Sequence, residues 1–216
     1  MVRDRNMDRD WVFINRYYQE LLEADVYDQP EDSGHTSKAK DVLMRWLPKI
    51  DDAKSVLDVG CGTGFCYKYF SEFGYSYLGL SVGLERKNPT IFNLDYNFTK
   101  FKDNSFDLVF SRHSLEHSPF PLITLMEWHR IAKQYLILIL PDPEYYTYIG
   151  RNHYGVMPAQ LASWLLRRAG WLVIEHDYSD DTEIRFLCSK QKRLGFEGYV
   201  DALDHRTYER DRIGYE

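Results

Sequence analysis

Three glycines at alternate positions follow a short apolar run, and this pattern is the strongest chemical signal in the chain. Residues 55–64 read SVLDVGCGTG, in which Asp58 precedes Gly60, Gly62 and Gly64. The apolar residues around Asp58 are typical of a buried parallel strand. Glycine allows a sharp turn and a close approach between backbone and ligand, because it has no Cβ. A strand, a glycine turn and a following helix together predict a cradle of nucleotide size.

Histidines are the candidate general bases, since the imidazole group titrates near neutral pH. His117 ends the run HSLEH at residues 113–117. His153 lies in a tyrosine-rich segment, YYTYIGRNHY, that we expect to face a substrate. We therefore take His117 and His153 as the candidate catalytic residues.

The run HSLEH also matches H-x-x-E-H, a zinc-peptidase pattern. Two histidines four residues apart on a helix can share a metal ion. Here the run directly follows a predicted strand, and Pro119 and Pro121 come soon after it, so a long helix cannot carry it. We predict no metal site and assign the run to a loop that closes on the ligand.

The elements that must position these residues alternate between strand-like and helix-like patterns. The predicted strands are 55–59, 75–80, 90–94, 105–111, 135–140, 171–176 and 183–188, and the predicted helices are 11–25, 38–47, 65–73, 121–132 and 158–169. This alternation predicts an α/β fold with a Rossmann-like, doubly wound, seven-stranded, mostly parallel sheet and helices on both faces. The last two strands have no helix between them, so we expect a hairpin and one antiparallel strand. The polar segment 28–37 is expected to be a loop.

Length and composition are those of one folded domain, with 216 residues of which 44% are apolar. We divide the chain 1–216 into N-terminal cap helices (1–50), a core (51–190) and a charged C-terminal tail (191–216). We expect the cap helices and the loop 141–157 to cover the site and choose the substrate. The tail is a candidate contact between two copies of the chain in a homodimer.

Charge and hydropathy limit the partners that the chain can have. The formal net charge is −6, which disfavours nucleic acid, because phosphate contacts come from clustered Lys and Arg. The N-terminus is charged throughout and does not resemble a signal peptide. The longest apolar run, 135–140, is too short to span a bilayer. With three cysteines and no disulfide framework, the chain is predicted to be cytoplasmic.

The glycine turn, read together with two later segments, resembles the class I S-adenosylmethionine-dependent methyltransferases, in particular the type 11-like group. The run DVGCGTG at 58–64 is similar to the cofactor loop of that family. Residues 94–117, LDYNFTKFKDNSFDLVFSRHSLEH, resemble its acid-ending third strand, its FDLV strand and the LEH that follows. Residues 153–175 are similar to its later helix and sixth strand. The resemblance covers roughly residues 40–190.

The resemblance implies S-adenosylmethionine as the cofactor, with S-adenosylhomocysteine as its product. Asp58 and the backbone of the glycine turn would hold the amino-acid part of the cofactor. Asp95 would accept a hydrogen bond from the adenine amino group, and Tyr96 would lie beside the adenine ring. Ser111 and Arg112 would line the methionine portion through their backbone. The implied cofactor-binding residues are Asp58, Gly60, Cys61, Gly62, Gly64, Ser81, Asp95, Tyr96, Ser111 and Arg112.

Ser81 departs from the family pattern, which places an acid there to hold both ribose hydroxyls. Glu85 is a candidate for a displaced acid. If Glu85 does not take this role, the alternative is that cofactor binding is weak and that the chain is a non-catalytic cofactor-binding or scaffold protein that retains the fold. A nicotinamide-dependent oxidoreductase is disfavoured, because its fingerprint requires a glycine where Phe65 stands and an acid where Ser81 stands.

The sequence as a whole therefore predicts a methyltransferase that transfers a methyl group from S-adenosylmethionine by in-line displacement. The acidic balance favours a small-molecule or saccharide acceptor, with no nucleic acid and no membrane as partner. Alignment and desolvation of the acceptor can be sufficient for such a transfer, so a general base is optional.

Overall fold

A computed structural model describes residues 16–21, 35–81, 91–93, 97–144, 153–179 and 182–192. Within these ranges, no helix is both long enough and apolar enough to cross a lipid bilayer. Of the predicted N-terminal helix, residues 16–21 are described, and they are helical. The tail beyond residue 192, which the sequence assigns to a homodimer contact, lies outside the described residues.

The described elements alternate along the chain as the sequence predicts. The helices are α2 (His35–Trp46), α3 (Tyr67–Glu72), α4 (Pro121–Ile131) and α5 (Ala159–Ala169), with 3₁₀ turns η1 (Leu47–Lys49) and η2 (Leu115–His117). The strands are β1 (Ser55–Val59), β2 (Ser76–Ser81), β3 (Ile91–Asn93), β4 (Phe106–Arg112), β5 (Ala132–Pro141), β6 (Trp171–Ser179) and β7 (Glu183–Lys190).

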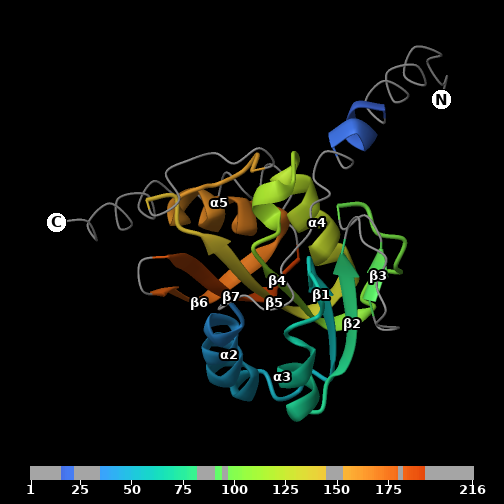
Figure 1. Cartoon of the computed structure of the whole chain (residues 1–216), viewed down its shortest axis with the longest axis vertical. Coiled ribbons are helices and arrows are strands. Elements are labelled where there is room, and N and C mark those ends of the chain that lie inside the picture. Colours follow the sequence, from blue (N-terminus) through green and yellow to red (C-terminus); the bar gives the residue numbers. More distant parts are fainter. Residues whose placement is uncertain are drawn as a thin grey trace.

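The strands form one sheet in the order β3-β2-β1-β4-β5-β7-β6. Strands β1 to β5 pair in parallel, whereas β7 is antiparallel to both β5 and β6. Helices α2 and α3 cover one face of the sheet, and α4 and α5 cover the other (Figure 1). The predicted α/β architecture, with helices on both faces and a late antiparallel hairpin, is confirmed.

Strand β5 shows how the sheet divides the core into two layers. Its side chains alternate, as they must in an extended strand that is buried on both faces. Leu136, Leu138 and Leu140 belong to the cluster on the α4 and α5 side. Ile137 and Ile139 belong to the cluster on the α2 and α3 side. The continuous apolar run is therefore explained by burial on both faces.

Two element boundaries differ from the sequence predictions. Helix α2 begins at His35, within the segment 28–37 that was predicted to be a loop. Strand β5 begins at Ala132, directly after α4, although the sequence predicts helix through that residue. The last carbonyls of α4 accept hydrogen bonds from the amides of Asn104 and Ser105. The chain can therefore leave the helix and become extended with no loop between them.

Asp107 joins three strands at the amino-terminal edge of the sheet. Its Oδ2 accepts hydrogen bonds from the amides of Lys54 and Ser55 at 3.0 and 2.9 Å and from the Ser55 hydroxyl at 2.8 Å. Its Oδ1 pairs with Lys133 at 2.7 Å. Burial alone would raise its pKa, but these hydrogen bonds outweigh that effect and lower it to about 2.

We expect Asp107→Asn to lower the free energy of unfolding by about 1–2 kcal/mol, because hydrogen bonds to a charged acceptor are the stronger ones. The folded-state pKa lies below the ordinary value. The stabilisation is therefore complete above about pH 4 and is lost as the pH falls towards 2. Urea unfolding at several pH values measures both effects. The control is Asp103→Asn, whose side chain is 72% exposed and pairs with Arg130, so it should change stability little. Equal losses for the two variants would contradict this account.

Candidate functional site

The glycine turn after β1 lies where three strand ends meet. In the register of the sheet, Val59 is opposite Leu80 of β2 and Ser111 of β4. The Cys61 amide donates to the Leu80 carbonyl at 2.9 Å, so the turn is tied to the end of β2. In open α/β sheets, ligands bind at the carboxyl ends of the strands, where the strand order reverses. This edge is therefore the candidate site.

All three glycines of the turn have positive φ. The values are 71° at Gly60, 55° at Gly62 and 85° at Gly64, in the left-handed region that residues with a Cβ rarely adopt. Ser114, just beyond β4, packs against Gly60 and donates a hydrogen bond to the Val59 carbonyl at 3.2 Å. The turn thus closes against the segment that follows β4.

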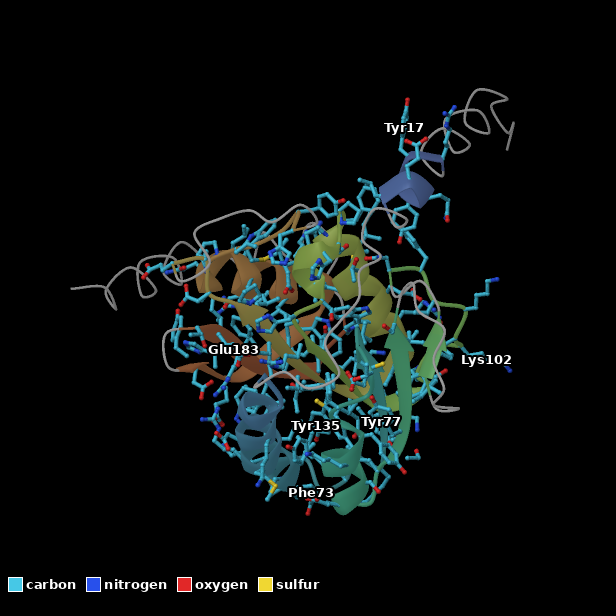
Figure 2. The ribbon with its side chains drawn as sticks, in the orientation of Figure 1. Tyr17, Phe73, Tyr77, Lys102, Tyr135 and Glu183 are labelled. Atoms are coloured by element: carbon cyan, nitrogen blue, oxygen red, sulfur yellow. The ribbon has the colours of Figure 1, made fainter. Side chains whose placement is uncertain are left out.

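Asp58 is buried beneath this turn with Tyr77 as its partner. The Tyr77 hydroxyl donates to Asp58 Oδ2 at 2.7 Å (Tyr77 is labelled in Figure 2). Gly79 lies directly opposite Asp58 in the sheet, and a Cβ there would come within 3.2 Å of the Tyr77 hydroxyl and 2.7 Å of Cys61 Sγ. The missing side chain of Gly79 therefore makes room for both groups.

Burial raises the pKa of Asp58 to about 7, although the Tyr77 hydrogen bond and the charge of Arg112 act in the opposite direction. The carboxyl group is thus close to half-protonated at neutral pH in the free chain. A cationic ligand group beside it would favour the ionised form. Asp58 is therefore suited to hold a positive charge.

The structure brings together most of the residues predicted to bind a cofactor. Ser81 ends β2 and is 6% exposed. Ser111 is completely buried near the end of β4, and its hydroxyl has no hydrogen-bond partner among the described residues. Asp95 and Tyr96 lie outside the described residues, as does Glu85.

Arg112, by contrast, is held by a residue that the sequence analysis did not consider. Glu183 is 1% exposed and accepts from Arg112 at 2.5 Å and from Arg185 at 3.2 Å (Glu183 is labelled in Figure 2). His113 Nε2 lies 3.0 Å from the same carboxylate. Burial alone would raise the pKa of Glu183, but His113 and Arg112 outweigh it and lower that pKa to about 2.

Glu183 and Tyr77 could have been found by a wider search. The predicted site residues lie at or after the carboxyl ends of parallel strands, which form the site edge of the sheet. An antiparallel strand instead brings its first residue to that edge, and Glu183 begins β7 opposite Pro141. Tyr77 precedes Gly79 by two residues in β2, so the two share a face of the sheet. The pattern that indicates the Tyr77–Asp58 contact is a glycine placed opposite a buried acid in the next strand, with a tyrosine two residues before that glycine.

A second cluster forms where η2 meets the segment before α5, and we call Glu116, His117 and His153 the η2 cluster. The rings of His117 and His153 are 4.6 Å apart in an edge-on arrangement. One nitrogen or oxygen from each of the three residues lies within 4.8 Å of the others. The two candidate catalytic residues are therefore neighbours, although the sequence does not predict it.

Within the η2 cluster, Glu116 and His153 have buried polar atoms with no hydrogen-bond partner among the described residues. Glu116 is 1% exposed, and neither carboxylate oxygen has a hydrogen bond among the described residues. Burial raises its pKa to about 8. Burial also lowers the pKa of His153, so this imidazole is neutral at neutral pH. His113 does not join His117, because its ring is turned towards Glu183.

Comparison with known proteins identifies the family. The profile of the family described as methyltransferase domain matches residues 33–197. An uncharacterized protein of Methanocaldococcus jannaschii, MJ0638, is 39% identical over 97 residues, which cover 40% of this chain and 40% of that protein. This chain thus aligns with well under half the length of that relative.

Solved methyltransferases share the fold. An S-adenosylmethionine-dependent methyltransferase of Archaeoglobus fulgidus is 17% identical with a TM-score of 0.59, covering 72% of this chain and 94% of that chain. The 1,6-didemethyltoxoflavin-N1-methyltransferase of Burkholderia thailandensis was solved with bound 1,6-didemethyltoxoflavin and S-adenosylhomocysteine. It is 14% identical with a TM-score of 0.62, and the match covers 89% of this chain and 93% of that chain. At these identities the likeness is one of fold. Because the family profile spans most of the chain, the protein belongs to the methyltransferase domain family.

Proposed function

We propose that this protein is a class I methyltransferase of the seven-stranded type that uses S-adenosylmethionine. The observation that carries the proposal is the buried Asp58 carboxyl beneath the glycine turn, with its pKa near 7. S-adenosylmethionine supplies an electrophilic methyl group on a positively charged sulfur, together with an ammonium group. A carboxyl group that ionises when a cation approaches suits such a ligand better than a phosphate.

The residues at this edge fit the cofactor in two further ways. The unpartnered Ser111 hydroxyl is buried near the end of β4, opposite Val59, and lacks a hydrogen bond among the described residues that a ligand could supply. Arg112 is paired with Glu183, so its charge is largely neutralised and repels a cationic ligand little. We assign Asp58 and the backbone of residues 60–64 to the amino-acid part of the cofactor. Ser81, Asp95 and Tyr96 remain the predicted contacts to its ribose and adenine.

The acceptor side is assigned to the η2 cluster. His153 is half-buried, so a ligand can reach its ring beside the end of β4, and His117 lies buried next to it at 9% exposure. A neutral His153 is able to accept a proton from an acceptor. We propose a small-molecule or saccharide acceptor, in keeping with the net charge of −6, and a cytoplasmic enzyme.

The direct test is calorimetry with S-adenosylhomocysteine, followed by assay of its production from S-adenosylmethionine across a panel of small-molecule and saccharide acceptors. We expect saturable binding of one ligand per chain and turnover with at least one acceptor. Binding without turnover on any acceptor would favour the scaffold alternative. The absence of binding at millimolar ligand would contradict the cofactor assignment.

Cofactor affinity should depend on pH through Asp58. Below about pH 7 the free carboxyl is protonated, so binding of the ammonium group must release that proton. The dissociation constant of S-adenosylhomocysteine should rise by up to about tenfold per unit of pH below 7 and stay constant above it. Asp58→Asn should bind weakly with little pH dependence. Asp107→Asn is the matched control, because its pKa of about 2 keeps it ionised throughout this range. A wild-type pH profile in Asp58→Asn would refute the role of this carboxyl.

Gly60 should not tolerate a side chain. A Cβ there would lie 1.7 Å from Ser114 Oγ, in addition to the cost of a positive φ. Gly74 also has a positive φ, 76°, but nothing lies within 4 Å of its would-be Cβ. We expect Gly60→Ala to destabilise the fold by about 1–3 kcal/mol more than Gly74→Ala. It should also weaken S-adenosylhomocysteine binding at least about tenfold, while Gly74→Ala binds normally. Urea unfolding and calorimetry measure the two effects, and equal behaviour of the variants would show that the Ser114 contact is unimportant.

A further inference from the structure

We propose that the η2 cluster is a metal site in which Glu116, His117 and His153 bind one divalent transition-metal ion of the zinc type. Two imidazoles and one carboxylate form a recognised ligand set for Zn²⁺ with an open coordination position. The set differs from the H-x-x-E-H pattern in the sequence, because His113 is turned to Glu183 and His153 comes from a distant segment.

The spacing of the ligand atoms suits a single ion after a small closure. The three candidate atoms lie within 4.8 Å of one another. In a tetrahedral zinc site each ligand atom is about 2.1 Å from the metal, so two ligand atoms are about 3.4 Å apart. The atoms therefore need to converge by at most about 1.5 Å. Rotation of the half-buried His153 ring and of the Glu116 carboxylate can supply this movement.

Unsatisfied polar atoms point to the same conclusion. Both carboxylate oxygens of Glu116 and Nδ1 of His153 are buried without a hydrogen-bond partner in the part of the chain that the structure describes. Buried polar groups are nearly always partnered, so each such group in a native fold needs an explanation. A proton on Glu116 would occupy only one of its two oxygens and would bring no partner to His153 Nδ1. A cation, by contrast, would satisfy the carboxylate and the imidazole nitrogen together.

Backbone hydrogen bonds hold the two halves of the cluster in place. The Glu116 carbonyl accepts from the Tyr154 amide at 2.8 Å and from the Gly155 amide at 2.9 Å. The His117 amide bonds to the Ser114 carbonyl at 3.1 Å, within η2. The segment that carries His153 is thus fixed to the turn that carries Glu116 and His117, which reduces the entropy lost when the ligands converge.

The surrounding charges are compatible with a bound cation. His113 Nδ1 lies 3.7 Å from Glu116 Oε1, beyond hydrogen-bond distance, and its Nε2 is held by Glu183. The charge of Arg112 is in turn paired with Glu183. The ion would lie beside the end of β4, with one position open to the side where His153 is half-exposed. That position suits an oxygen of the acceptor, and a bound ion would take the place of His153 as the group that assists removal of its proton.

Metal binding by the full chain tests the inference. After removal of metal with a chelator, the protein is titrated with Zn²⁺ against a chromophoric competitor, and with Co²⁺ to follow its visible d–d absorption. We expect one ion per chain and a cobalt spectrum of nitrogen and oxygen ligation. His153→Ala and Glu116→Gln should each weaken metal binding at least about tenfold. Loss of a residue that only hydrogen-bonds to a metal ligand already costs about that much, and loss of a ligand costs more.

The control is His176→Ala, which removes an exposed histidine of β6 that is not part of the cluster and should leave binding unchanged. His153→Ala changes a half-buried residue outside any helix or strand, so it decides the question if Glu116→Gln does not fold. Absence of stoichiometric binding, or binding equally strong in His153→Ala, would overturn the metal site. The titration needs neither cofactor nor acceptor, so this failure would leave the methyltransferase proposal intact.

Discussion

The close approach of Gly60 to Ser114 is the constraint on which the rest of the site depends. The ends of β1 and β4 can be adjacent in the sheet only if the chain leaving each strand finds room beside the other. Gly60 provides this room, and Ser114 uses it to donate to the Val59 carbonyl. This contact holds the glycine turn on one side, and on the other it fixes where η2 begins.

Three buried carboxyl groups near this edge have three different environments. Glu183 is surrounded by cationic groups and stays ionised, with its pKa lowered to about 2. Asp58 has one neutral donor, Tyr77, and its pKa rises to about 7. Glu116 has no hydrogen-bond partner among the described side chains, and its pKa rises to about 8. Glu183 therefore has a structural role. The carboxyl groups of Asp58 and Glu116, by contrast, are left without a compensating charge until a cation or a proton binds to them.

Much of the fold could be predicted because the patterns are local. The alternation in β5, the glycine at the end of α5 and the proline near its start are each read from a few neighbouring residues. The predicted boundary of α4 was wrong because the amides of Asn104 and Ser105, far from it in sequence, satisfy its last carbonyls. The family resemblance rests on three segments in order along the chain, and the match of the family profile confirms it. The individual cofactor contacts remain predictions.

The sequence by itself determined the glycine turn, the order of strands and helices and the family, because these depend on residue types at short spacing. Only the tertiary structure decided which partner each buried charged group has. His113 and His117 are four residues apart, yet one contacts Glu183 and the other lies beside His153. The reason is physical: β7 runs antiparallel and brings Glu183 to the carboxyl edge, and the Glu116 carbonyl binds the segment after His153. Contacts of this kind depend on the order of the strands within the sheet and on their register, which no short stretch of sequence records.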